Sequence, residues 1–218
     1  MDFISPQDPN TYNIKFNGNH KNMDFITPQA PDTYNIILND NNKYIIDFLS
    51  QYNLIHSILD DSIIISADKI DNLDNFIKTT KNKDMFIKKF IYDLGAQIFL
   101  LKDYRLGIKH FNLKDIIVLN NKVFLFNNPN NIYSLSEKEY KYGFIDLQTI
   151  DKESQFIPPE FSNNELKEFY YSTSFYSFVK LLLFCFDIKI HDIQGTSLYY
   201  FCKRCLEKNP EDRVFLYI

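Results

Sequence analysis

The chain has 218 residues, of which 45% are hydrophobic and 17% aromatic, and its formal net charge at pH 7 is -4. Enough apolar residues are present to build a core, which excludes an intrinsically disordered chain. The slightly acidic balance excludes a protein that binds nucleic acids through a general excess of positive charge.

Hydrophobicity and cysteine content give further expectations about the compartment. No apolar run approaches the ~20 residues that span a bilayer, and the N-terminus lacks the basic and apolar regions of a signal peptide. The three cysteines, Cys185, Cys202 and Cys205, are too few for a disulfide framework. Cys202 and Cys205 form a Cys-x-x-Cys pair, but without a second pair or a nearby histidine we expect no bound metal. We therefore expect a cytoplasmic protein that contacts neither membranes nor nucleic acids.

The N-terminus contains a duplication: residues 1–14 and 23–36 are nearly identical. Two copies are fewer than a solenoid needs, and their Pro, Asn and Asp content is typical of turns. We interpret residues 1–36 as an N-terminal extension that arose by tandem duplication. The functional alternative is a repeated docking segment, whose anchors would be the aromatic residues Phe3, Tyr12, Phe25 and Tyr34.

The remaining chain has periodic elements in a clear order. Apolar residues at three- and four-residue intervals predict a helix over residues 43–52, and two short strands follow at 53–59 and 62–66. Residues 68–77 are expected to form a connection and a short helix. A second amphipathic pattern predicts a long helix over residues 83–104.

Four segments farther along resemble, in order, the C-terminal lobe of protein kinases. Residues 110–119, His-Phe-Asn-Leu-Lys-Asp-Ile-Ile-Val-Leu, resemble the catalytic loop His-Arg-Asp-Leu-x-x-x-Asn. Residues 156–161, Phe-Ile-Pro-Pro-Glu-Phe, resemble the end of the activation segment. Residues 174–183 and 205–213 resemble the start of the large buried helix and the Cys-Leu-x-x-x-Pro-x-x-Arg ending of that lobe.

This resemblance implies an α+β, mainly α, kinase-like fold. Residues 37–70 would form a reduced N-terminal lobe, and residues 71–218 would form a helical C-terminal lobe. The helix from about residue 173 to 187 has almost no polar face, so we expect it to lie at the centre of that lobe. The resemblance also implies that Glu160 and Arg213 form a buried ion pair that ties the activation segment to the last helices.

The segment that resembles the catalytic loop matches the kinase pattern at structural positions but differs at the proton-accepting and metal-binding positions. In the kinase pattern the Asp accepts the proton of the substrate hydroxyl and the final Asn holds a magnesium ion. Here these positions are Asn112 and Ile117, and neither an amide nor an alkyl side chain can replace those functions. His110 and Lys114 are retained. In Ser/Thr kinases the lysine at the position of Lys114 contacts the transferred phosphate.

The phosphate-binding parts of a kinase also have no counterpart. The chain has Gly18 and then no glycine before Gly95, so no Gly-x-Gly-x-x-Gly hairpin is present, and residues 1–136 contain no glutamate. Lys15 is the only candidate for the phosphate-contacting lysine, with Asp47 as a short substitute partner. The counterpart of the magnesium-binding Asp is Asn127, Asp146 or Asp151, and none of them is followed by Phe-Gly.

These replacements predict a catalytically inactive pseudokinase that uses no cofactor. It would act as a scaffold or allosteric regulator whose protein partner is an active kinase or its substrate. One alternative is a weak Ser/Thr kinase with unconventional metal binding through Asp115, Asp146 or Asp151. Another is a structural or virion component. The composition, rich in Ile, Asn and Lys, is typical of an A/T-rich genome such as that of a large DNA virus, in which case the compartment is the host cytoplasm or the virion.

Overall fold

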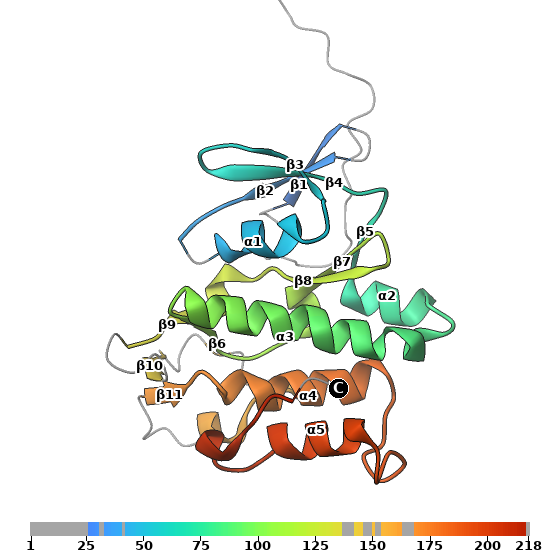
Figure 1. Ribbon diagram of the computed structural model, residues 1–218, viewed down its shortest axis with the longest axis vertical. Coiled ribbons are helices and arrows are strands. Elements are labelled where there is room, and N and C mark those ends of the chain that lie inside the picture. The colour runs from blue at the N-terminus through green and yellow to red at the C-terminus, as the bar shows by residue number, and fades with distance from the viewer. Residues whose placement is uncertain are drawn as a thin grey trace, which may run out of the picture.

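The computed structural model describes residues 26–30, 33–40, 42–136, 142–145, 150, 154–162 and 168–216. The described residues form helices and small antiparallel sheets, which confirms the expected α+β class. Figure 1 shows a sheet and one short helix at one end of the molecule and a stack of longer helices at the other.

The first sheet has four antiparallel strands in the order β1-β2-β4-β3. The strands are β1 (Ile26–Ala30), β2 (Thr33–Ile37), β3 (Ile55–Ile58) and β4 (Ser62–Ser66). Helix α1 (Tyr44–Ser50) lies below this sheet in Figure 1. Its buried residues, Tyr44, Ile45, Phe48 and Leu49, recur at the three- and four-residue spacing of one helix face.

The second sheet has three antiparallel strands, β5 (Ile70–Asn72), β7 (Ile116–Leu119) and β8 (Val123–Phe126), in the order β5-β7-β8. All four residues of β7 and all four of β8 are buried. Continuous apolar strands of this kind are expected where both faces of a sheet are covered. Helix α2 (Leu73–Thr79) follows β5 directly, and the Asn72 side chain caps it by accepting a 2.7 Å hydrogen bond from the Asn75 backbone N–H.

On the edge of β8 that does not pair with β7, side chains take the place of a further strand and bond to the backbone. Helix α3 (Ile87–Asp103) supplies Asp93, which accepts from Phe124 N–H at 3.0 Å, and Gln97, which donates to Phe124 C=O at 2.8 Å. Gln97 also accepts from Phe126 N–H at 2.8 Å, and Tyr44 of α1 donates to Phe126 C=O at 2.8 Å. Buried backbone groups must be paired, so these side chains fix α1, α3 and β8 against one another.

Helices α3, α4 (Thr173–Cys185) and α5 (Ser197–Cys205) form the other end of the molecule, with α4 between α3 and α5 in Figure 1. Nine of the 13 residues of α4 are buried, including Phe178, so the expected central helix is confirmed. Phe178 stacks on Phe90 of α3 with ring centroids 5.6 Å apart and meets Phe201 of α5 edge-on at 6.2 Å. Phe90 in turn meets Phe124 of β8 at 5.1 Å. A single aromatic core thus joins the helices to the second sheet.

Two small antiparallel pairs complete the strands: β6 (Leu106–Ile108) with β9 (Ile132–Ser134), and β10 (Tyr142–Phe144) with β11 (Glu168–Tyr170). Short 3-10 helices connect the elements: η2 (Lys83–Phe86), η3 (Leu113–Asp115), η4 (Pro129–Asn131), η6 (Pro159–Ser162) and η7 (Pro210–Asp212). β9 and β10 approach closely at Gly143, where a Cβ would lie 2.2 Å from the Ser134 carbonyl oxygen and 2.6 Å from the Tyr133 ring. Only glycine permits this approach.

Most of the predicted elements are confirmed, and one boundary is wrong. The predicted helix over residues 43–52 is α1, the strand at 62–66 is β4, and the helix over 83–104 is η2 followed by α3. We expected residues 1–36 to be an extension outside the fold. Instead, the second copy of the duplication forms β1 and β2, and Ile36 is completely buried. The boundary expected between residues 36 and 37 therefore falls inside β2.

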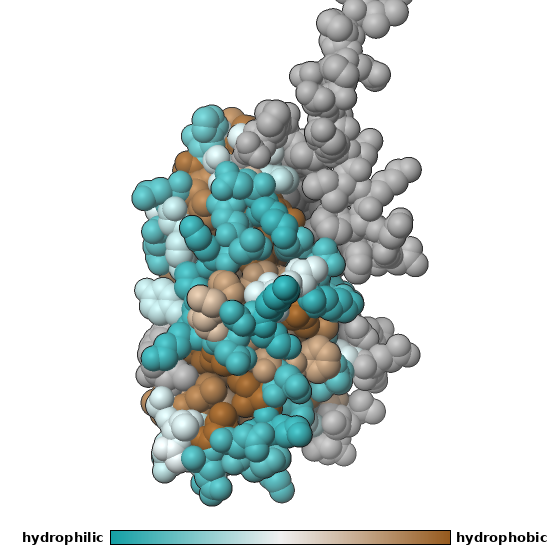
Figure 2. Space-filling view, turned by 90° about the vertical axis from the view of Figure 1, so that its right-hand side faces the viewer, coloured by the Kyte–Doolittle hydropathy of each residue, from teal (hydrophilic) through white to brown (hydrophobic). Residues whose placement is uncertain are grey.

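The described surface contains both hydrophilic and apolar areas. Figure 2 shows one face of the molecule, on which teal residues surround brown apolar areas in the lower half. Among the described residues, none of the helices combines the length and the apolarity that crossing a membrane requires.

Candidate functional site

The candidate site is the loop between β6 and β7, which carries the residues that resemble a kinase catalytic loop. His110 and Asn112 are buried, whereas Lys114 is exposed. Ile117 is 2% exposed and lies within β7, where it pairs with Asn72 on one side and Leu125 on the other. The structure brings His110 and Asn112 together, and it places Ile117 in the apolar core as a strand residue.

The side chain of Asn112 is engaged at both ends of its amide. Its Nδ2 lies 3.0 Å from His110 Nε2, and its Oδ1 accepts a hydrogen bond from the hydroxyl of Ser154. The loop is also anchored from below, because Ser177 of α4 accepts from Phe111 N–H at 2.7 Å. An amide oxygen is not a base near neutral pH, and this oxygen already has a donor. Asn112 therefore acts as a fixed part of the structure.

Asp115 is the centre of the hydrogen-bond network and is completely buried. Its Oδ1 accepts from Asn128 Nδ2 at 2.7 Å, and its Oδ2 accepts from Asn112 N–H at 3.0 Å and from Asn131 Nδ2 at 3.1 Å. Asn131 Nδ2 also donates to the His110 carbonyl at 2.6 Å. We call Asp115, Asn127, Asn128 and Asn131 the amide cluster. It joins the loop before β7 to the segment after β8.

Burial in this cluster raises the pKa of Asp115 to about 6. The hydrogen bonds from Asn128, Asn131 and Asn112 N–H, together with the charge of Lys114, act in the opposite direction. Removal of the carboxylate from water is therefore the dominant effect, as expected for a carboxyl group surrounded by neutral amides.

Asn127 follows β8 directly and differs from its neighbours. Its backbone N–H donates to the Asp115 carbonyl at 2.7 Å. Its side chain is 3% exposed, and neither Oδ1 nor Nδ2 has a hydrogen-bond partner among the described residues. Of the three candidates for the counterpart of the magnesium-binding aspartate, only Asn127 is described, because Asp146 and Asp151 lie outside the described residues. Lys15 lies outside them as well.

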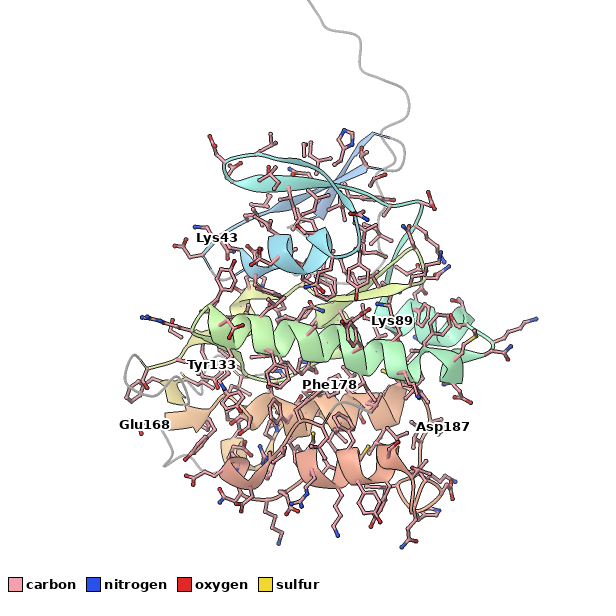
Figure 3. All side chains as sticks on the ribbon, viewed as in Figure 1. Lys43, Lys89, Tyr133, Glu168, Phe178 and Asp187 are labelled. Atoms are coloured by element: carbon pink, nitrogen blue, oxygen red, sulfur yellow. The ribbon has the colours of Figure 1, made fainter. Side chains whose placement is uncertain are left out.

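A second group of buried polar residues connects α3 to the region after α1. Asp93 is completely buried and accepts from Tyr52 Oη at 2.5 Å and from the ammonium group of Lys89. Burial raises the pKa of Asp93, opposed by the hydrogen bonds from Lys89 and Tyr52. Figure 3 labels Lys89 on α3, and its Nζ lies 4.2 Å from the centroid of the Tyr52 ring. The sequence analysis did not predict this group, because Tyr52 and Asp93 are 41 residues apart and meet only in the folded chain.

Asp47, the expected substitute partner of Lys15, is on α1 and accepts a 2.6 Å hydrogen bond from Tyr104 Oη. This contact ties α1 to the end of α3. Asp47 thus has a role in the packing of the described structure.

The predicted ion pair between Glu160 and Arg213 is present. The guanidinium donates to both carboxylate oxygens of Glu160, at 2.6 and 2.8 Å, and the two side chains are 5% and 0% exposed. Arg213 also donates to the carbonyls of Glu207 and Lys208 at 2.8 and 3.2 Å, and its guanidinium lies 5.2 Å from the Tyr176 ring. The pair joins η6 to the segment after α5 in a bidentate geometry.

Sequence reasoning also missed Asn128 and Asn131 as members of the amide cluster. The available signal was the run Asn-Asn-Pro-Asn-Asn at residues 127–131, directly after a buried strand. Comparison of the chain with protein-family models and with curated proteins found no match.

Proposed function

We propose that this chain is a kinase-like protein without catalytic activity that works through contacts with other proteins. The order of the elements supports this proposal. The sheet of β1–β4 with α1 precedes a helical part in which α4 is central, as the resemblance to protein kinases implies. The bidentate pair of Glu160 and Arg213 supports it further, because the resemblance named both residues.

The observation that carries the proposal is the state of Asn112. At the position where kinases have the proton-accepting Asp, this amide has its oxygen occupied by Ser154 and its nitrogen beside His110. Proton acceptance requires a basic atom within reach of the substrate hydroxyl. Asn112 offers no such atom, and Ile117 removes the metal ligand that the motif usually supplies.

A weak Ser/Thr kinase that uses Asp115 as a metal ligand is the alternative. Three N–H groups donate to the Asp115 carboxylate, and the residue has no exposed surface. A hard cation would have to displace these donors. Asp146 and Asp151, the other candidate metal ligands of this alternative, lie outside the described residues. A structural or virion role, the remaining alternative, requires no particular side chains in the loop between β6 and β7.

A phosphorylation assay with radiolabelled ATP tests the enzymatic alternative. The chain is incubated with Mg²⁺ or Mn²⁺ and general Ser/Thr substrates, and an Asp115→Asn variant is the matched control. We expect no incorporation above background with either protein. Incorporation by the natural chain that is lost in Asp115→Asn would support the weak kinase instead.

The proposed mode of action needs a second assay. Proteins captured with the chain are identified, and any kinase among them is purified and assayed with and without the chain. A regulator changes the rate of that kinase or its choice of substrate. If captured kinases show unchanged kinetics and unchanged substrate choice, the regulatory role is contradicted and the purely structural role remains.

A further inference from the structure

The second copy of the N-terminal duplication supplies an inner strand of the first sheet. β2 lies between β1 and β4, with Tyr34 opposite Ile65, Asn35 opposite Ile64 and Ile36 opposite Ile63. The first copy, residues 11–14, has the same four residues as positions 33–36, Thr-Tyr-Asn-Ile. The chain therefore carries two segments with the same sequence for one strand position.

The residue types of the first copy fit the burial of the corresponding positions in β2 and just after it. Ile36 is completely buried, and its counterpart is Ile14. Ile37 is 41% exposed, and its counterpart Lys15 suits an exposed position better. Leu38 packs partly against the core, and its counterpart Phe16 is also apolar.

The differences between the two copies avoid β2. Within residues 1–14 and 23–36 they are Ser5 against Thr27, Asp8 against Ala30 and Asn10 against Asp32. Positions 27 and 30 belong to β1, which is an edge strand, and position 32 lies between β1 and β2. No difference falls in the part of the repeat that pairs with β4 at Thr33–Ile36.

We infer that residues 4–15 are a second occupant of the strand positions of residues 26–37, so that the two copies exchange within one chain. The exchange is independent of the proposed function. At the four positions Thr33–Ile36, β4 would meet the same side chains in the same register, and at the fifth position Lys15 would replace the exposed Ile37 opposite Ser62.

Two features favour the second copy at rest. Residues 38–43 connect β2 to α1, whereas residues 16–43 would connect the first copy to α1. Loop closure scales with length to the power of about 3/2, so the longer connection disfavours the exchanged state by ~tenfold. In addition, the buried side chain of Asn42 donates to Ile37 C=O at 3.0 Å and accepts from Asn39 N–H at 2.6 Å. His20 has the place of Asn42 in the first copy.

Exchange would alter the coupling between the first sheet and the candidate site. The short connection and the Asn42 hydrogen bonds fix β2 to the start of α1, and Tyr44 at that start donates to Phe126 C=O next to Asn127. With the first copy in place, α1 keeps its contact with β8 but is joined to the sheet by a long tether. The repeat would thus adjust how firmly the sheet is attached to the rest of the molecule.

A rescue experiment tests the exchange. Ile36→Asp puts a carboxylate at a completely buried position and should unfold a chain that lacks residues 1–22, which has no alternative strand. In the full chain the same substitution should leave the protein folded, with the folding equilibrium constant reduced ~tenfold by the longer connection and further by the loss of the Asn42 hydrogen bonds. Ile14→Asp alone should leave the full chain unchanged. The double variant Ile14→Asp/Ile36→Asp should behave like the truncated Ile36→Asp chain.

A disulfide trap reports the register directly. In the Ile36→Asp background, Asn13→Cys/Ile64→Cys should form a disulfide, because directly opposed residues of antiparallel strands have suitable Cα separations. Asn35→Cys/Ile64→Cys in the otherwise natural chain is the positive control, and the three natural cysteines are all buried. Equal destabilisation by Ile36→Asp with and without residues 1–22, or no trapped disulfide, would overturn the inference. So would a rescue found only in a dimer, because the strand would then come from a second molecule.

Discussion

The Glu160–Arg213 pair and the amide cluster are both buried polar groups, but only the first is completely satisfied. Arg213 uses its guanidinium on both oxygens of Glu160 and on two backbone carbonyls. In the amide cluster, Asp115 has three N–H donors, yet the neighbouring Asn127 side chain has no partner among the described residues. The ion pair thus has all its hydrogen-bonding groups engaged, whereas the cluster leaves one buried amide without a partner among the described residues.

The two regions should also respond differently to substitution. In a buried bidentate ion pair, loss of either partner leaves an uncompensated buried charge, so a single substitution at Glu160 or Arg213 should strongly destabilise the protein. In the amide cluster each side chain has its own set of hydrogen bonds. We therefore expect the Asn131 side chain to contribute to stability and the Asn127 side chain, which has no partner among the described residues, to contribute nothing. Four predictions follow this contrast, from the largest expected effect to the smallest.

Glu160→Ala should destabilise the protein by about 3 to 5 kcal/mol, because Arg213 would stay buried without its counter-charge. The measurement is the free energy of unfolding in urea, together with the melting temperature. Asp74→Ala is the control, since it removes the exposed i,i+4 pair with Lys78 and should cost no more than about 0.5 kcal/mol. A similar small loss in both variants would show that the ion pair is not structural.

Asp115 should make stability depend on pH in a direction opposite to that of an ordinary salt-bridged aspartate. Its pKa in the folded protein is about 6, above the ordinary aspartate value of 3.8. The folded state therefore binds the proton more tightly, and stability is lost as pH rises from about 4 to 6, by about 3 kcal/mol in total.

This dependence is isolated by comparison with Asp115→Asn, which has no titrating group there. The free energy of unfolding of the natural chain minus that of the variant should fall between pH 4 and pH 7. Asp93 is present in both chains, so its own raised pKa cancels from the difference. A difference that stays constant over this range, or rises, would contradict the conclusion that burial is the dominant effect on the Asp115 carboxylate.

Asn127→Leu and Asn131→Leu should change stability in opposite directions. Leu at position 127 removes a buried amide that has no hydrogen-bond partner among the described residues, and should stabilise the protein by about 1 kcal/mol. Leu at position 131 removes hydrogen bonds to Asp115 and to the His110 carbonyl and should cost about 1 to 3 kcal/mol. Urea unfolding of both variants provides the test. Destabilisation by Asn127→Leu would reveal a bound water or ligand at that amide.

Deletion of residues 1–22 should have the smallest effect, within about 0.5 kcal/mol, because the second copy of the repeat already occupies β1 and β2. Thermal melts of the full and truncated chains provide the measurement. A much lower melting temperature for the truncated chain would mean that the first copy contributes to the folded state at rest.

The sequence predicted those helices and strands whose apolar pattern lies within one short segment of the chain. The spacing of Ile45, Phe48 and Leu49 gave α1, the Ile run 63–65 gave β4, and the apolar Phe175–Leu182 stretch gave the buried helix α4. The pair of Glu160 and Arg213 came from the family resemblance. β1 and β2 were missed because their Pro and Asn content is typical of turns, while their pairing partner β4 lies about 30 residues later.

The interior of the candidate site could not be predicted in the same way. Asp115 meets Asn128 and Asn131 only because β7 and β8 fold back on each other, which brings residues on both sides of the hairpin together. The same holds for Asp93, whose partner Phe124 N–H is 31 residues away. Side-chain networks of this kind follow from tertiary packing and leave little trace in local periodicity.

The central proposal is that this protein neither binds nor uses nucleotide, and a thermal melt with ATP tests it most directly. A ligand at a hundredfold excess over its Kd stabilises the folded state by about 2.7 kcal/mol, which shifts a melting curve by several degrees. We predict no shift with millimolar ATP and Mg²⁺. A shift that requires Mg²⁺ and disappears in Asp115→Asn, Asp146→Ala or Asp151→Ala would contradict this account and favour the alternative of a weak Ser/Thr kinase.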